Sequence, residues 1–251
     1  MIYLVHTAHW QFLGLALGFL AWIFTMTTAG LNEWRLWHVA DVSVINSGVA
    51  WVGIWRACFY SHVLPKMENC QSISVSDTFV PVEIPVAQVM IMVAVICGLV
   101  ANVIAAVAMR MAYFSLEDRR NIRLVFVLAG TLYLLTGTVS LVPVVWNMNS
   151  VLNNSTIDFP PEFHLPVAPV RQQVGSAIGV GIFASILMLI SGLLFLSYYY
   201  ACHTLKSEAP RDTRDPLQGP GTVTTMAQES ELPNGVRQGR NNPAFHSEEV
   251  S

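Results

Sequence analysis

The chain has 251 residues, of which 53% are hydrophobic and only 12% are charged, with a formal net charge of −3. Twelve of its 29 charged residues lie in residues 202–251, so the first 201 residues carry 17, or 8.5%. Soluble domains carry about 25% charged residues, and a soluble surface this poor in charge would expose large apolar patches. The composition argues strongly against a soluble enzyme, and the lack of a basic stripe argues against a nucleic-acid binder.

Four apolar segments are long enough to cross a membrane as helices, since about 20 apolar residues span the roughly 30 Å of hydrocarbon. They lie at residues 10–29, 86–109, 124–146 and 174–200. Barrel strands alternate apolar and polar residues, whereas these segments are apolar on all sides, so we expect an α-helical membrane protein with a four-helix bundle. The first segment could also be a signal peptide, but residues 1–9 lack Lys and Arg and its apolar run is long.

The basic residues of the connecting segments predict the orientation of the chain. The connection at 110–123 carries four Arg, and the segment at 201–251 begins with three more basic residues. The connection at 147–173 has one Arg, and the loop at 30–85 has three basic residues against five acidic ones. We therefore expect residues 1–9, 110–123 and 201–251 to be cytoplasmic and the two larger loops to face outside. The tail is rich in Pro, Gly, Asn and charge, so we expect it to be disordered.

Two kinds of modification site agree with this orientation. Residues 153–156 read Asn-Asn-Ser-Thr and contain overlapping glycosylation sequons at Asn153 and Asn154, in a loop already assigned to the outside. Their occupancy stays open, because so short a motif often arises by chance. Cys202 follows the fourth span directly and is a candidate for S-palmitoylation, with a free cytosolic thiol as the alternative.

The loop at 30–85 is too short to build a large hydrophobic core and needs a covalent staple. Cys58 and Cys70 both lie in this outside loop, where disulfides persist, while the other two cysteines lie within a span and on the cytoplasmic side. We expect them to pair and to contribute about 2–4 kcal/mol. Residues 46–48, Asn-Ser-Gly, are typical of a turn between two strands. Trp55, three residues before Cys58, is expected to pack on the disulfide.

The chain resembles the claudin family in the residues of both outside loops. In the first, the residues that match the family's W…GLW…C…C signature are Trp34, Gly53, Ile54, Trp55, Cys58 and Cys70. In the second, Phe159-Pro160-Pro161 is similar to the aromatic-x-Pro tip that claudins use in contacts between cells. Residues 173–177 resemble the E-F-G-x-A entry to the last span. The resemblance covers about residues 1–205, and residues 33–37 together with the long tail look most like the claudin-34 branch.

This resemblance implies a left-handed four-helix bundle that carries a small antiparallel sheet, mostly from the first loop with one strand from the second. It implies a structural component of tight junctions at the plasma membrane. Such a protein binds itself and other claudins side by side in one membrane, binds them head to head across the gap, and contacts membrane lipid. A barrier or a weakly selective path between cells follows. Gln71, directly after the second Cys, is neutral, so no strong charge filter is expected.

Several positions depart from the family pattern. Ile54 stands where Leu is usual, Gln88 where an Arg precedes the second span, and Gln173 where a Glu precedes the fourth. The chain ends in Val250-Ser251, whereas claudins that bind PDZ scaffolds end in an apolar residue that fills the groove pocket. Direct PDZ binding is therefore doubtful. An auxiliary subunit of an ion channel or receptor stays open as the alternative function, since relatives of claudins with the same signature have that role.

Other features of the spans favour packing over chemistry. The small-xxx-small pairs Gly14/Gly18 and Gly175/Gly179 allow close helix approach, either within the bundle or between copies. Asn102 is a lone polar residue in the second span, for which we expect a hydrogen bond to another helix. We find no catalytic motif, no metal-ligand spacing and no intramembrane relay of carboxylates, so neither an enzyme nor a cofactor is expected.

Overall fold

The computed structural model describes residues 2–39, 45–61, 68–114, 119–163 and 169–207. The chain divides into two units, residues 1–209 and residues 210–251. The second unit contains the Val250-Ser251 ending and most of the tail for which disorder is expected, and it lies outside the described residues. Everything below concerns the first unit.

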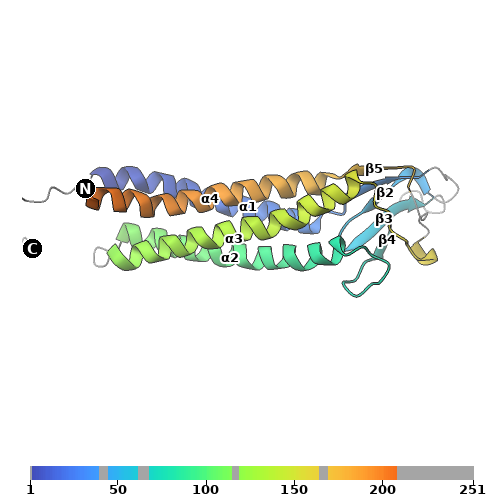
Figure 1. Ribbon diagram of the computed structural model, residues 1–251, viewed down its shortest axis with the longest axis horizontal. Coiled ribbons are helices and arrows are strands. Elements are labelled where there is room, and N and C mark those ends of the chain that lie inside the picture. The colour runs from blue at the N-terminus through green and yellow to red at the C-terminus, as the bar shows by residue number, and fades with distance from the viewer. Residues whose placement is uncertain (1, 40–44, 62–67, 115–118, 164–168, 208–251) are drawn as a thin grey trace, which may run out of the picture. The chain divides into compact units, whose positions relative to one another are not determined.

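Four long helices form a bundle in this unit (Figure 1). They are α1 (Ile2–Gly30), α2 (Glu83–Phe114), α3 (Arg119–Leu152) and α4 (Ser176–Ser207). Each contains a stretch long and apolar enough to cross a membrane, and fewer than half of the residues in the most apolar part of each stretch are buried. The remaining apolar side chains face outward, where lipid would cover them. The helices pack mainly as the pairs α3–α4, α2–α3 and α1–α4.

Polar contacts and small residues hold these helices together at close range. The Tyr133 hydroxyl of α3 donates to Oδ1 of Asn102 in α2 at 3.0 Å, which confirms the interhelical bond expected of that amide. A Cβ at Gly14 would lie 3.1 Å from the Phe195 ring, and one at Gly18 would lie 2.6 Å from the Tyr133 ring. This pair therefore packs inside the bundle. Gly179, by contrast, has no atom within 4 Å of a Cβ built on it and faces outward.

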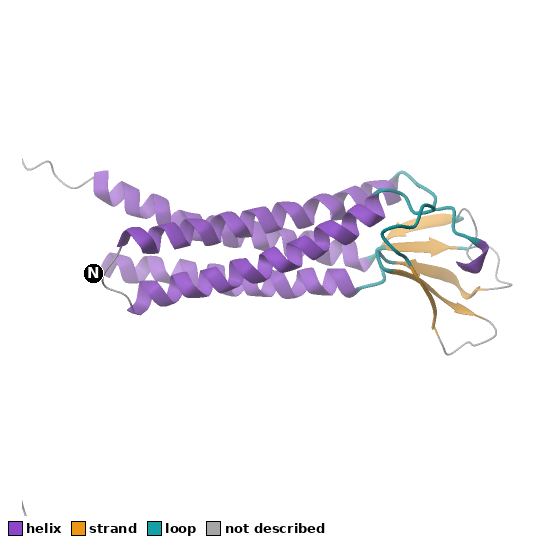
Figure 2. Ribbon diagram, turned by 90° about the horizontal axis from the view of Figure 1, so that it is seen from below, coloured by secondary structure: helices purple, strands orange, loops and turns teal. Residues whose placement is uncertain are grey.

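A five-stranded antiparallel sheet lies at the end of the bundle where α1 ends and α2 begins (Figure 2). Its strands follow the order β4-β3-β2-β1-β5 across the sheet. Four lie between α1 and α2: β1 (Arg35–His38), β2 (Ile45–Val52), β3 (Arg56–Ser61) and β4 (Glu68–Ser72). The fifth, β5 (Arg171–Val174), lies just before α4 and pairs with β1. The predicted four-span bundle with a small sheet built from both loops is confirmed.

The turn predicted at residues 46–48 is wrong. Strand β2 runs without a break through this segment, and the register of its pairing with β3 shifts between Ile45 and Ala50. Gly48 has a φ of 63°, a conformation that glycine adopts without a steric penalty. A glycine at positive φ is a common way to insert a bulge into a strand, so the local preference that suggested a turn produces a bulge instead.

Candidate functional site

The signature residues of the first loop attach the sheet to the helices. Trp34 is 1% exposed, and its indole Nε1 donates to the carbonyl of Thr28 at 3.1 Å. That carbonyl belongs to the last turn of α1, where carbonyls lack partners within the helix. Gly53 leaves no room for a side chain, since a Cβ there would lie 2.9 Å from Cα of Asn32. Ile54 is buried, so these residues serve as anchors.

The disulfide joins the two strands at one edge of the sheet. Cys58 in β3 and Cys70 in β4 lie directly opposite each other in the register, with an S–S distance of 2.07 Å. The expected pairing is therefore present. The side-chain amide of Asn32 contacts this bridge, with Nδ2 at 3.7 Å from Sγ of Cys58. Trp55 is partly buried against the core of the sheet, and its packing on the disulfide stays a prediction. Glu68 lies nearby, but both sulfur atoms are used by the disulfide, which leaves a single carboxylate and no metal-ligand set.

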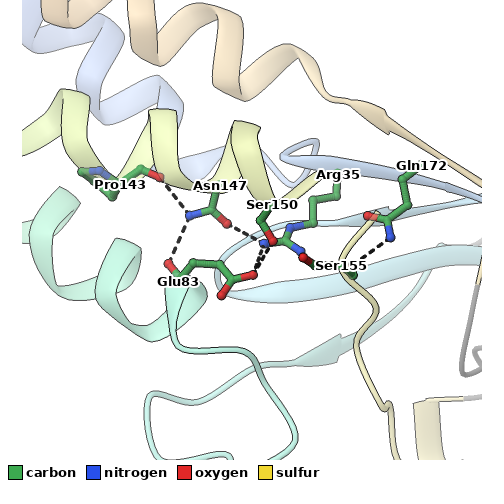
Figure 3. A network of polar contacts seen from close by, with 7 residues as sticks. All are labelled: Arg35, Glu83, Pro143, Asn147, Ser150, Ser155 and Gln172. Carbon is green, nitrogen blue, oxygen red and sulfur yellow. Dashed lines mark hydrogen bonds and ion pairs between the residues drawn. The ribbon is translucent and has the colours of Figure 1, made fainter. Parts of the chain in front are cut away.

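A buried polar network connects the sheet to α2 and α3 (Figure 3). Arg35 of β1 is 1% exposed, and its Nη2 donates to Oε1 of Glu83 at 3.1 Å and to Oδ1 of Asn147 at 2.9 Å. The Ser150 hydroxyl donates to the same Oε1 of Glu83. Burial lowers the pKa of the Arg35 guanidinium, while its bond to Glu83 and the charge of Glu83 act in the opposite direction. The network fixes the sheet on the helices through one ion pair.

Asn147 completes the connection by using both ends of its amide. Its Nδ2 donates to the backbone carbonyl of Glu83 at 3.1 Å and to that of Pro143 at 2.9 Å. Three elements thus meet at one side chain: β1, the first turn of α2 and the last turns of α3. The apolar run that predicts the third span ends at Trp146, but α3 continues to Leu152. It can do so because the polar side chains of Asn147 and Ser150 have hydrogen-bond partners.

The sequence interpretation missed this network. The sequence predicts only that Arg35 and Glu83 are charges of the first outside loop and that Asn147 and Ser150 belong to the second. The available signal was their position, since each stands within a few residues of the end of an apolar run, where a charge or an amide has little access to water. Their pairing could not be inferred, because Arg35 and Asn147 are 112 positions apart.

The residues that replace family positions also have structural partners. Gln88 is fully buried, and its Nε2 donates to the carbonyls of Ile54 at 2.6 Å and Ile73 at 3.1 Å. A neutral amide in the second turn of α2 therefore holds the turn before β3 and the end of β4. Gln173 lies in β5, opposite Leu36 of β1.

The segment Phe159-Pro160-Pro161 divides between the interior and the surface. Phe159 is 6% exposed, and its ring lies 5.2 Å from that of Trp37 and 5.2 Å from that of Phe163, centroid to centroid. Pro160 is half-buried and Pro161 is exposed. The aromatic ring is therefore part of the core beneath the sheet, and the prolines are what this segment presents to the outside.

The candidate modification sites lie in different parts of the unit. Asn153 and Asn154 directly follow α3 at the sheet end and are both exposed. Asn154 has a φ of 54°. Cys202 lies in the last two turns of α4, but its side chain lies outside the described residues.

The connection between β5 and α4 requires a residue without a side chain. Gly175 donates its backbone N–H to the carbonyl of Trp34 at 3.0 Å, and Ala177 donates to that of Glu33 at 3.0 Å. A Cβ on Gly175 would overlap the carbonyl oxygen of Glu33. The Ser176 hydroxyl donates to Oε2 of Glu33 at 2.6 Å. The start of α4 is thus bonded to the segment that links α1 to β1.

Comparison with known proteins gives a consistent family. A sequence model described as PMP-22/EMP/MP20/Claudin tight junction matches residues 19–197. Claudin-3 of Rattus norvegicus is 26% identical over 221 residues, covering 85% of this chain and 93% of the relative. Claudin-2 of Bos taurus is 26% identical, covering 84% and 91%. Claudin-3 of Homo sapiens is 28% identical over 218 residues, covering 83% and 90%.

These relatives support a multi-pass membrane protein with a claudin-like role at tight junctions, at the level of the family. The narrower resemblance to the claudin-34 branch stays a prediction. The match extends from α1 to α4 and includes the disulfide, the sheet and the anchoring residues described above. The chain belongs to the PMP-22/EMP/MP20/claudin family of tight-junction proteins.

Proposed function

We propose that this protein is a structural component of tight junctions that seals the path between cells or lets ions pass it with weak selectivity. Family membership carries the proposal, together with the sheet that the bundle holds at one end. Strand β4 forms an edge of that sheet and is mostly exposed and polar, with the residues Glu68, Asn69, Cys70, Gln71 and Ser72. A polar edge resists aggregation and suits a strand that borders a water-filled path.

The charges of the described loops support weak selectivity. Arg35 and Glu83 are buried as a pair, so their charges cancel and neither faces water. Glu68 accepts a hydrogen bond from the Tyr60 hydroxyl at 2.9 Å. The acids Glu33, Glu68, Asp77 and Asp158 remain outside the core, against Arg56 and Arg171. The excess of two acidic charges is small, so the field favours cations only weakly.

The orientation forms part of the proposal: both termini cytoplasmic and the sheet outside the cell. Asn153 and Asn154 are exposed at the sheet end, where the glycosylation machinery would reach them only in this orientation. A glycosidase should therefore increase the gel mobility of the full chain. Substituting both residues, Asn153→Gln and Asn154→Gln, should give the faster mobility without enzyme. Glycosylation of a sequon placed at the α2–α3 connection instead would contradict this orientation.

Self-association in cis and in trans, with copies of itself and with other claudins, is the proposed route to a junction. The exposed Pro161 is the better probe of trans contact, because Phe159 lies in the core and its loss would disturb folding. Pro161→Glu should reduce enrichment at cell contacts, while Thr78→Glu, another exposed loop position at the sheet end, should not. A PDZ scaffold is not expected to be needed for this enrichment.

The decisive experiment expresses the chain in cells that lack tight junctions and examines their contacts by freeze-fracture. Continuous intramembrane strands and a raised electrical resistance across the cell layer are the expected results. Cys58→Ser serves as the control, because it should reach the cell surface in a smaller amount. A protein that stays diffuse at the surface and co-purifies with a channel would refute the junction proposal and favour the role of auxiliary subunit.

A further inference from the structure

A groove opens where the sheet meets the first two helices, and none of its lining residues belongs to the buried network or to Phe159-Pro160-Pro161. It has a volume of about 560 Å³. Its walls are apolar side chains of α1 and α2: Met26 and Ala29 on one side, Met92 and Val95 on the other. Gly30, the last residue of α1, also lines it and leaves open space, since nothing lies within 4 Å of a Cβ built there.

The walls of this groove continue the membrane-facing surface of the helices. Met26 is 38% exposed and Met92 is 44% exposed, and the nearby Ile23 and Val89 are exposed as well. One turn before Met26, the Trp22 indole donates to the carbonyl of Val95 at 2.9 Å and bridges α1 to α2. Beyond this bridge, toward the sheet, the two helices leave the groove between them. Flexible methionine side chains adapt well to an apolar chain of variable shape.

The sheet end of the groove is polar and positively charged. Arg56, the first residue of β3, is exposed, and its Nε donates to Oδ1 of Asn32 at 2.8 Å. Within the described part of the chain, its two Nη groups have no hydrogen-bond acceptor and no carboxylate at ion-pair distance. Trp55 lies beside it, half-buried, as tryptophans do at the boundary between membrane and water. Arg56 lines the groove together with Gly30, the last residue of the apolar helix α1, where a lipid phosphate would lie, and a guanidinium binds phosphate strongly.

We propose that this groove binds one membrane phospholipid, with its phosphate on the Nη groups of Arg56 and an acyl chain along Met26, Ala29 and Met92. A sterol has no charge to match the guanidinium. A spanning helix of a second copy fits less well, because Glu83 in the first turn of α2 is the one acidic residue of the four described helices, and it is already paired with Arg35. The phosphate is the anion that the membrane itself supplies.

The first test separates recognition of the phosphate from burial of the chains. The full chain in detergent is titrated with a short-chain phosphatidylcholine and with the diacylglycerol of the same chains, and binding is followed by native mass spectrometry. We expect the phospholipid to bind about tenfold more tightly, because one charge-assisted contact contributes roughly this factor. Arg56→Gln should remove the difference between the two lipids. Arg171→Gln, at the other exposed Arg of the sheet, should keep it.

The second test blocks the apolar part without a clash within the chain. Gly30→Phe places a ring in the groove, and Gly179→Phe is its matched control, because a Cβ at either position meets open space. Gly30→Phe should lose the bound phospholipid, while Gly179→Phe should retain it. Equal retention by both variants would overturn the proposal, as would an Arg56→Gln chain that binds both lipids like the original. A Gly30→Phe chain that changes its oligomeric state but not its lipid binding would assign the groove to a second copy instead.

Discussion

Replacing Arg35 by methionine should destabilise the protein more than any exposed substitution in the sheet. The change removes a guanidinium that is 1% exposed and donates to Glu83 and Asn147. The Glu83 carboxylate would then remain largely buried, with the Ser150 hydroxyl as its remaining side-chain donor. Breaking one side of a buried ion pair costs about 3–5 kcal/mol, which corresponds to about 10 °C in the midpoint of thermal unfolding for a chain of this size.

A double-mutant cycle shows whether the loss comes from the unpaired charge. Adding Glu83→Leu to Arg35→Met removes both charges, and we expect at least half of the lost stability to return. Arg171→Met in β5 is the matched control and should cost less than about 0.5 kcal/mol, because that side chain is exposed. Thermal unfolding in detergent is measured for the original chain, the two single variants, the double variant and the Arg171→Met control. A shift below about 3 °C for Arg35→Met, or a double variant as unstable as the sum of the single ones, would refute the reasoning.

Three further predictions concern the disulfide, the entry to α4 and the interior of the bundle. Cys58→Ser should cost about 3 kcal/mol of unfolding free energy and lower the fraction of expressed protein that reaches the cell surface. Cys97→Ser should leave both quantities unchanged. Gly175→Ala should prevent folding because its Cβ has no space, while Gly179→Ala should be neutral. In a protease-protection assay, the Gly175→Ala chain should be digested and the Gly179→Ala chain should resist digestion. Tyr133→Phe should cost about 0.6 kcal/mol, measured by thermal unfolding, and an unchanged midpoint would show that its bond to α2 contributes nothing.

The parts of the fold that the sequence predicts are those encoded over short distances. The four helices follow from apolar runs of about 20 residues, since a helix of that length spans the hydrocarbon core of a membrane. The pairing of Cys58 with Cys70 follows from the placement of the cysteines in one loop, and the structure confirms it. The resemblance to a known signature correctly implied the strand that the second loop adds to the sheet.

The remaining features depend on contacts that local patterns do not encode. The ion pair of Arg35 with Glu83 joins residues 48 positions apart, and neither residue type indicates burial by itself. An Asn-Ser-Gly segment suits a turn and a bulge equally, and only the pairing of β2 on both sides decides between them. Phe159 before two prolines indicates an extended segment, but its place beneath Trp37 depends on how the second loop returns to the sheet.

The order of strands across the sheet has a consequence for how the protein is made. Leu36 of β1 pairs with Gln173 of β5, 137 positions later in the chain, so one side of β1 has no partner until α2 and α3 have been synthesised. Contacts between segments so far apart form slowly, and an open strand edge is prone to wrong pairing in the meantime. In the proposed orientation, the emerging chain exposes this unpaired strand edge in the lumen of the compartment where it is inserted. Chains that stop before β5 would keep that edge open and expose themselves to retention and degradation.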